Sequence, residues 1–259
     1  MTQGGFTLHS GAADAAHPLG YKYYELFGDV CPDDETILAI YTKADVVGRN
    51  IFTIRSLGGT DGTKILGYGA WNGSVVLKDY VQKFADNDIR KRQFRYGANP
   101  YGPQPSGFIN YSLDITSLDN PGAAPNDGAR NQKFYPVTPG SSGGASNDFP
   151  IYRLADILLM KAECQVRLGN ATAAKPFIDE VRTRAGLAGL AANPTLEDVY
   201  NERGFELTFE GHRRQDMIRF DKFTLAHDFT PATGDFRKLF PIPTSALNAN
   251  KNLVQNTGY

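Results

Sequence analysis

Two consecutive segments, residues 148–169 and 171–186, constrain the fold most, because both have helical periodicity and only a short turn separates them. In the first segment, apolar side chains recur at steps of three or four residues, at Ile151, Leu154, Leu158 and Ala162. Asp148 can cap the start of this helix, Pro150 fits its first turn, and Gly169 ends it. Because the connecting turn is so short, the sequence predicts two antiparallel helices packed side by side.

The second helix has an apolar stripe of its own, formed by Ala174, Phe177, Ile178, Val181 and Ala185. Pro176 fits only near the start of this helix, and Gly186 terminates it. A helix pair of about 34 residues is typical of a tetratricopeptide repeat, and about three such units are needed to close a core. Because the sequence shows one such pair, we expect either further helix pairs upstream of Met1 or irregular partner helices.

The chain changes character in its middle. Residues 1–146 are rich in Gly, Pro, Asn and Ser and contain only short periodic segments. Among these, 34–42 predicts a strand or a helix, and 75–85 predicts a helix capped by Ser74. Long loops such as those between them are usually functional or mobile. We therefore expect one mainly α domain with few short strands, loop-rich over 1–146 and helical over 147–259.

A third helix should follow Pro194. Thr195 and Asp198 have the spacing of a capping box, which places the helix start at about residue 196. We expect this helix to run to about residue 210, with Gly211 as the place for a break, and then to continue to about residue 222.

Charged side chains crowd this third helix. In a helix, Glu202, Glu206 and Glu210 would share one face. They could serve acid–base catalysis, as in a glycoside hydrolase that uses Glu206 and Glu210. However, each carboxylate has a basic neighbour that would hold its pKa low, whereas a general acid needs a raised pKa. We therefore favour a structural ion-pair network, whose expected members are Arg153, Asp156, Glu163, Glu202, Arg203, Glu206, Glu210, Arg213, Asp216 and Arg219.

Composition argues against several classes of site. The chain has 27 Lys and Arg against 28 Asp and Glu, so it lacks the basic excess of a nucleic-acid-binding protein. Cys31 and Cys164 have no CxxC spacing, and His212 has no histidine four residues away, which argues against a metal site. No apolar run approaches the roughly 20 residues of a membrane span, and the N-terminus lacks the pattern of a signal peptide. We expect no cofactor and no metal.

Four sequence blocks resemble, in order and spacing, the C-terminal half of the SusD/RagB family. They are "DFPIYRLADILLMKAEC", "VRTRAGL", "ERGFELTFEGHRRQDMIRF" and "LFPIPTSALNANKNLVQNTGY". Together they lie within residues 147–259, and a weaker similarity extends back through 69–94. The chain departs from the family pattern at Arg214-Gln215, where members often have aromatic residues, and at Phe220, where Trp is common.

The resemblance implies a SusD-like fold, built around tetratricopeptide-like helix pairs, in which the loop-rich region faces the ligand. Members of the family are surface lipoproteins of the bacterial outer membrane that bind glycans or other nutrients. They sit as lids on SusC-type TonB-dependent transporters, and they are not enzymes. By resemblance, the chain is therefore a nutrient-binding protein whose signal peptide, lipid anchor and first helix pairs would lie upstream of Met1.

Trp71 is the first candidate for a glycan contact, because sugars stack on exposed aromatic faces. It is the single Trp of the chain and lies in the glycine-rich stretch "LGYGAWNGS", with Tyr68 before it and Asn72 after it. Tyr101, in "NPYGPQP", is a further candidate. The competing interpretation of Trp71 is core packing, since Trp is highly buried on average.

Other interpretations stay open at this level. Asp88, Arg90 and Arg92 could contact sugar hydroxyls, although a solvated helix end is the simpler interpretation. Two rival functions are a glycoside hydrolase that uses Glu206 and Glu210, and a cytosolic tetratricopeptide-type scaffold that binds peptides.

Overall fold

The computed structural model describes residues 4–44, 46–97, 107–116, 125–136, 143–227 and 229–259. Within it the chain forms two compact units, Met1–Glu210 and Gly211–Tyr259, hereafter unit 1 and unit 2. The loop-rich region and the helix hairpin therefore belong to the same unit, and the boundary falls inside the charged stretch.

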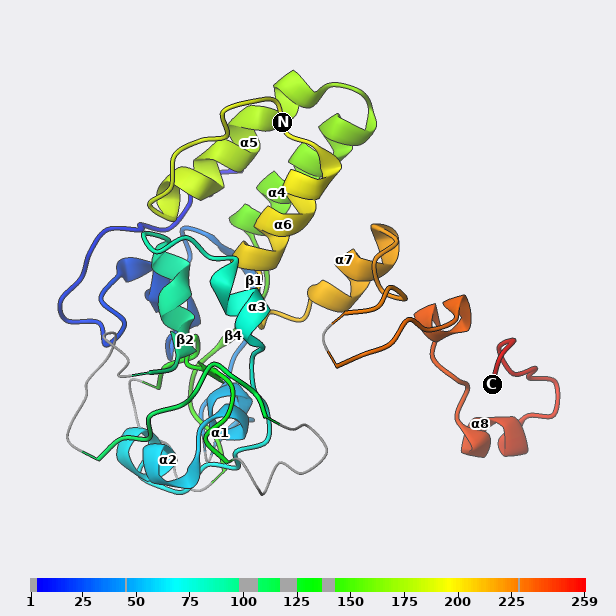
Figure 1. Ribbon diagram of the computed structural model, residues 1–259, viewed down its shortest axis with the longest axis horizontal. Coiled ribbons are helices and arrows are strands. Elements are labelled where there is room, and N and C mark those ends of the chain that lie inside the picture. Colours follow the sequence, from blue (N-terminus) through cyan, green and yellow to red (C-terminus); the bar gives the residue numbers. More distant parts are fainter. Residues whose placement is uncertain (1–3, 45, 98–106, 117–124, 137–142, 228) are drawn as a thin grey trace. The chain divides into compact units, whose positions relative to one another are not determined.

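A layer of three helices forms one side of unit 1 (Figure 1). α4 (Leu154–Arg167) packs against α5 (Ala171–Arg184) and α6 (Leu196–Glu206). The helical hairpin expected from the apolar periodicity is confirmed. The contact surface shared by the three helices is fully buried and consists mainly of Leu158, Leu159, Ala162, Ala174, Ile178, Val181 and Val199. The small side chains of Ala162 and Ala174 allow the helices to approach closely.

The capping box at the start of α6 is confirmed. The Thr195 hydroxyl accepts the Asp198 N–H at 3.2 Å, and the Asp198 carboxylate accepts the Thr195 N–H at 2.8 Å. At its other end, α6 stops at Glu206 and not near residue 210, since Phe209 has a positive φ of 65°. A left-handed conformation at this residue cannot continue a right-handed helix.

The segment before α4 is a strand and not a helix start. β4 (Phe149–Arg153) pairs antiparallel with β1 (Thr36–Ile40). The prediction that Asp148 caps the helix is therefore wrong, because its carboxylate accepts the Thr42 N–H at 2.8 Å. Pro150 lies in the strand, not in a helical turn. Long-range pairing with β1 decides the conformation, and of the two alternatives left open for 34–42 the structure shows the strand.

The remainder of unit 1 consists of short elements joined by irregular chain (Figure 1). These are η1 (Lys22–Phe27), α1 (Phe52–Ser56), α2 (Gly59–Leu66), α3 (Lys78–Gln82), η2 (Ile89–Gln93), β2 (Phe94–Arg95) and β3 (Arg130–Asn131). The helix expected over 75–85 is shorter than predicted. Leu77 is its N-cap, whereas the Ser74 N–H donates to the Arg55 carbonyl.

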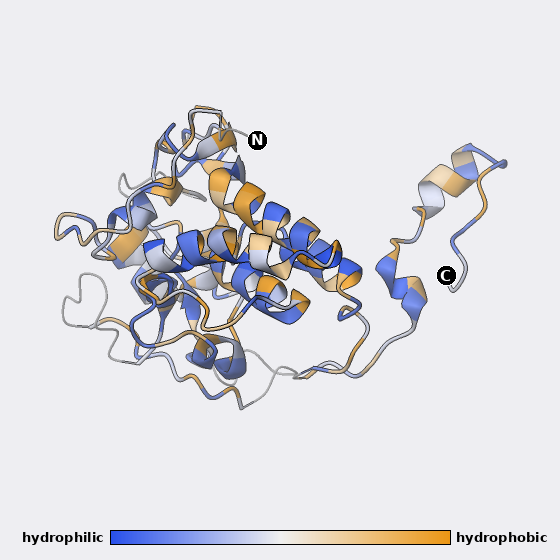
Figure 2. Cartoon of the chain, turned by 90° about the horizontal axis from the view of Figure 1, so that it is seen from above, coloured by the Kyte–Doolittle hydropathy of each residue, from blue (hydrophilic) through white to orange (hydrophobic). Residues whose placement is uncertain are grey.

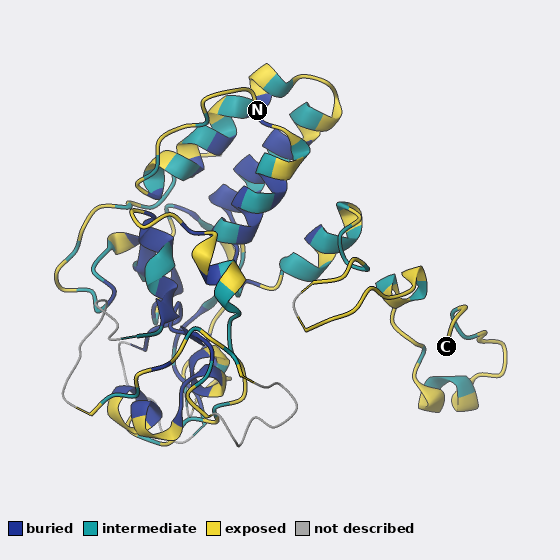
Figure 3. Cartoon of the chain, in the orientation of Figure 1, coloured by how far each residue is buried: buried dark blue, intermediate teal, exposed yellow. Residues whose placement is uncertain are grey.

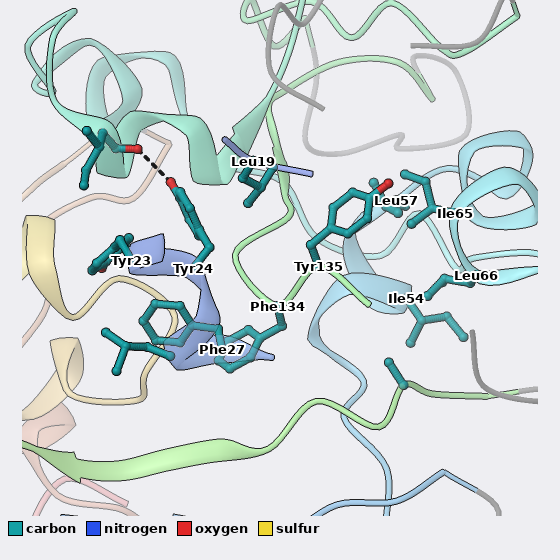
Figure 4. Packing of buried hydrophobic residues seen from close by; sticks show 13 residues of the cluster. Leu19, Tyr23, Tyr24, Phe27, Ile54, Leu57, Ile65, Leu66, Phe134 and Tyr135 are labelled. Carbon is teal, nitrogen blue, oxygen red and sulfur yellow. Dashed lines mark hydrogen bonds between the residues drawn. The ribbon is translucent and has the colours of Figure 1, made fainter. Parts of the chain in front are cut away.

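An aromatic core holds these short elements together (Figure 4). Tyr23, Tyr24 and Phe27 of η1 stack edge to face, and Phe27 packs in the same way on Phe134, with ring centroids 5.6 Å apart. The Tyr24 hydroxyl donates to the Ile89 carbonyl at 2.9 Å, the bond drawn in Figure 4. Buried residues concentrate in this core and along the inner faces of the helices (Figure 3).

Unit 2 contains α7 (Arg213–Arg219), η3 (Asp235–Lys238) and α8 (Thr244–Ala249). Among its described residues only Asp216 is buried, and several large apolar side chains are exposed. Figure 2 shows apolar and polar residues intermixed along both units. Within the described ranges, no helix has the length and the hydrophobicity needed to cross a membrane.

Candidate functional site

The loop that contains Trp71 is bonded to the end of α1 over residues 71–74. The Trp71 N–H donates to the Ile54 carbonyl at 2.8 Å, and the Asn72 N–H donates to the Leu57 carbonyl at 2.9 Å. The Gly73 N–H donates to the Arg55 carbonyl at 2.6 Å. These bonds hold the backbone of an irregular segment in one place, as strand pairing does in a sheet.

The Trp71 side chain points to solvent. It is 53% exposed, although the residues on which its loop rests, Ile54 and Leu57, are buried. The loop also lies very close to α2: a Cβ atom at Gly62 would come within 2.3 Å of the Ala70 nitrogen, so only glycine fits there. Together the backbone bonds and this packing present an indole ring from a fixed position. Such a ring can stack on a sugar without ordering the loop first.

The neighbouring candidates behave differently. Asn72 has a φ of 51°, and its Oδ1 atom is buried without a hydrogen-bond partner in the described part of the chain. Tyr68 is half-buried, packs against the aromatic core, and exchanges hydrogen bonds with the backbone of Gly144. Its hydroxyl therefore ties two loops together. Tyr101 lies outside the described residues.

Four of the ten residues expected in the ion-pair network, Arg153, Glu202, Glu206 and Glu210, lie in a second site, which is buried. Nine side chains form a buried ion cluster, defined here as Glu35, Asp88, Arg90, Lys133, Arg153, Arg184, Glu202, Glu206 and Glu210. They come from segments spread over most of unit 1. None of the nine side chains is more than 5% exposed.

Arg153, at the junction of β4 and α4, is the centre of this cluster. Its Nη1 atom donates to Glu35 at 2.7 Å and to Glu206 at 2.6 Å. Its Nε and Nη2 atoms donate to the two carboxylate oxygens of Glu210, each at 2.7 Å. This is a bidentate arrangement, which guanidinium and carboxylate groups form with the best geometry. Arg153 thereby joins the start of α4 to the end of α6.

Arg90 plays the corresponding role for the other half of the cluster. It donates to Asp88 at 2.8 Å, to Glu202 at 2.6 Å and to Glu206 at 3.0 Å. Asp88 and Arg90 are 3% and 0% exposed, so the interpretation of this turn as a solvated helix end is wrong. The sequence gave no sign that the glutamate partners of Arg90 lie more than a hundred residues away.

Lys133 and the end of α6 are linked in the same cluster. The Lys133 Nζ donates to the Glu210 carboxylate at 2.6 Å and to the carbonyls of Glu206 and Thr208 at 3.1 and 2.9 Å. Arg153 Nη2 also donates to the Glu206 carbonyl, at 2.9 Å. In a longer helix these carbonyls would accept hydrogen bonds from backbone N–H groups. Here the Lys133 and Arg153 side chains are the donors, so α6 can end early without leaving its last carbonyls unpaired.

The pKa values of Glu206 and Glu210 are shifted in the direction of stable ion pairs, whereas that of Lys133 is shifted in the opposite direction. Burial alone would raise the pKa of Glu206, but Arg184, Arg153, Arg90 and Lys133 outweigh it and hold that pKa well below its ordinary value. Burial likewise opposes ionisation of Glu210, and Arg153 and Lys133 lower its pKa. Burial lowers the pKa of Lys133 to about 8. Glu206 and Glu210 are thus ionised and out of reach of solvent, which is the opposite of what a general acid requires.

The other residues expected in the network make different contacts. Arg203 donates to Asp156 at 2.7 Å and links α6 to α4, whereas Glu163 pairs with Arg167 one turn along α4. Arg213, Asp216 and Arg219 lie on α7 in unit 2, where Arg219 pairs with Asp216. The described residues contain no group of three or more His, Cys, Asp or Glu side chains arranged to hold a metal ion.

Comparison with known proteins agrees with this architecture. The sequence profile of the SusD family matches residues 72–229, which is more than half of the chain. The chain belongs to the SusD family. The matched range begins at Asn72, directly after Trp71, and includes the helical hairpin and the charged stretch.

Two curated relatives show how much of such a protein this chain represents. It is 34% identical over 122 residues to the starch-binding protein SusD of Bacteroides thetaiotaomicron, an alignment that covers 43% of this chain and 22% of the relative. It is 36% identical over 212 residues to a SusD-like protein of Formosa agariphila, covering 73% of this chain and 36% of the relative. The alignments thus span about a fifth to a third of the curated relatives.

Solved structures share the fold. A surface glycan-binding protein A of Bacteroides thetaiotaomicron, solved with laminarihexaose, matches with a TM-score of 0.69 at 23% identity, covering 98% of this chain and 56% of that one. A SusD superfamily protein of Parabacteroides distasonis matches with a TM-score of 0.67 at 26% identity, covering 91% and 53%. At these identities the similarity establishes the mainly helical SusD-like fold expected from the sequence.

Proposed function

We propose that this SusD-family chain binds an oligosaccharide and that Trp71 forms its stacking platform. The single observation that supports this most directly is the half-exposed indole of Trp71, whose backbone and that of the next three residues are bonded to the end of α1. Two proteins similar to this chain are a starch-binding protein and a surface glycan-binding protein solved with laminarihexaose. Stacking on a flat aromatic face suits the apolar face of a pyranose ring and needs no charged group.

The burial of Glu206 and Glu210 supports binding without chemistry. A glycosidase needs two carboxyls beside a cleft that admits substrate, whereas Glu206 and Glu210 are 0% and 4% exposed and are held by arginine and lysine side chains. We therefore propose that the chain delivers its ligand unchanged to a SusC-type TonB-dependent transporter, at the outer-membrane surface of the cell and attached by a lipid anchor.

Replacing Trp71 with alanine is expected to weaken oligosaccharide binding by about 10- to 100-fold, because a central aromatic contact commonly contributes 1.4 to 2.8 kcal/mol. Titration calorimetry against α- and β-glucan oligosaccharides measures the effect. In the unsubstituted protein, fluorescence gives a second readout, since the chain has a single Trp.

Tyr41→Ala is a matched control, because Tyr41 is an equally exposed aromatic residue at 57% and lies at the end of β1. It should leave affinity unchanged. If no oligosaccharide perturbs the Trp71 emission, or if both variants bind as the parent does, the proposed site is wrong.

The hydrolase alternative predicts release of reducing ends from the same oligosaccharides, with loss of that release in Glu206→Gln. We expect no release above background from the parent protein, because no substrate can reach a carboxylate that is fully buried. The scaffold alternative predicts a cytosolic protein. Detection of a lipidated form in the outer-membrane fraction, together with co-purification of a TonB-dependent transporter, would exclude it.

A further inference from the structure

A histidine near the N-terminus has both ring nitrogens against carboxylates. The His9 Nε2 atom lies 2.8 Å from Glu25 Oε2, and its Nδ1 atom lies 2.9 Å and 3.0 Å from the two oxygens of Asp34. Only 12% of the His9 side chain is exposed, whereas the Glu25 and Asp34 side chains are 39% and 42% exposed. The carboxylates therefore face solvent on one side and the imidazole ring on the other.

This geometry requires a protonated ring. A neutral imidazole has one N–H donor and one acceptor nitrogen, whereas ionised carboxylates only accept hydrogen bonds. Contacts from both nitrogens to Glu25 and Asp34 can be made together only when both nitrogens carry protons. Loss of one proton would remove a charge-assisted hydrogen bond and leave a nitrogen lone pair against a carboxylate oxygen.

Few other contacts hold the segment that includes His9. Thr7 donates its N–H to the Asp34 carbonyl at 2.9 Å, and His9 donates its own N–H to Glu35 at 2.7 Å. On the side facing α5, an open hollow of about 540 Å³ lies between residues 7–10 and the helix. The segment therefore gains little packing from α5 over these four residues.

The adjoining residues are attached by contacts that do not titrate. Lys22 donates its N–H to the Ala12 carbonyl at 3.0 Å, and Asp14 donates its N–H to the Gly20 carbonyl at 2.9 Å. Gly11 lies so close to α5 that a Cβ atom there would meet the Arg184 carbonyl oxygen. Any release of residues 7–10 should therefore stop at about Gly11.

We propose that His9 is a pH-sensitive latch that holds residues 7–10 against Glu25 and Asp34 when protonated and releases them when neutral. Histidine is the side chain that gains or loses its charge most readily near neutral pH, which suits it to such a latch. The charged groups facing it are Glu25 on η1 and Asp34 and Glu35 before β1. On α5, Arg184 pairs with Glu35, and Asp179 and Glu180 line the hollow.

Hydrogen exchange of the full chain at pH 5.5 and pH 8.5, corrected for intrinsic rates, tests the latch. At pH 8.5 the amides of Thr7 and His9 should exchange about tenfold or more faster than at pH 5.5, as expected for the loss of one charge-assisted bond. The amides of Asp14 and Lys22, which donate to backbone carbonyls, should keep their protection at both pH values.

His9→Gln should exchange rapidly at Thr7 and at residue 9 at both pH values, because glutamine keeps an amide donor but cannot become charged. His17→Gln is the matched control, since the His17 Nδ1 atom accepts the Leu19 N–H and its ring stacks on Tyr24. That variant should keep the pH dependence of the parent protein. Equal protection of Thr7 and His9 at the two pH values in the parent, or a pH dependence that persists in His9→Gln, would overturn the proposal.

Discussion

Arg153→Met is expected to destabilise unit 1 by about 3–5 kcal/mol, which is the usual cost of removing one partner of a buried ion pair. Methionine fills much of the same volume but leaves Glu35 and Glu210 with fewer hydrogen-bond donors. The substitution also removes the cation that lowers the pKa of Glu210 most. It also deprives the Glu206 carbonyl of one of its donors at the end of α6. Urea denaturation followed by far-UV circular dichroism measures the free energy of unfolding.

Arg167→Met is the matched control for this substitution. Arg167 lies at the last turn of the same helix and also pairs with a glutamate, Glu163, but its side chain is 42% exposed. Such exposed pairs contribute less than about 1 kcal/mol. If the two variants lose similar stability, the buried ion cluster does not have the structural role assigned to it here.

Acidification below about pH 4.5 is expected to destabilise the protein steeply. The pKa of Glu206 in the folded state is held well below its ordinary value of 4.5 by Arg184, Arg153 and Arg90, which outweigh the opposing effect of burial, and the pKa of Glu210 is also lowered. The unfolded chain therefore binds more protons than the folded chain below pH 4.5. The contribution of these groups is complete above that pH and is lost as the pH falls, at about 1.4 kcal/mol for each unit of pKa depression.

The free energy of unfolding between pH 6 and pH 3 tests this expectation. Glu206→Gln should be less stable than the parent at pH 6, and its stability should fall less steeply on acidification, because one carboxyl with a depressed pKa is absent. Glu180→Gln, on the exposed face of α5, should reproduce the slope of the parent. A slope in Glu206→Gln as steep as that of the parent would contradict the assignment.

Local sequence signals predicted those parts of the fold that depend on neighbouring residues. The helical hairpin follows from apolar spacing, since α4 and α5 bury the stripes that contain Leu158 and Ile178. The start of α6 follows from Thr195 and Asp198, whose reciprocal bonds span three residues. In each case the residues that decide the structure lie within one or two helical turns of each other.

The predictions that were wrong failed where a distant segment supplied the partner. Asp148 is a residue type that commonly caps helices, but its carboxylate accepts the Thr42 N–H, and the chain after it is paired with β1. Ser74 likewise precedes a helical pattern, yet its backbone is bonded to Arg55. Pairing with a strand or loop more than a dozen residues away outweighs a capping preference of about 1 kcal/mol.

By itself the sequence determined the family, the helical hairpin and the presence of a Trp in a glycine-rich loop, because these depend on residue identity and short-range spacing. Only the tertiary structure decided what the charged residues do. Glu206 and Glu210 lie near each other in sequence, but their partners Arg90, Lys133 and Arg153 come from separate segments. A carboxylate row on one helix and a buried ion cluster have the same sequence pattern. They differ only in which distant cations the fold brings to them, and therefore in whether those carboxylates face a ligand or hold the core together.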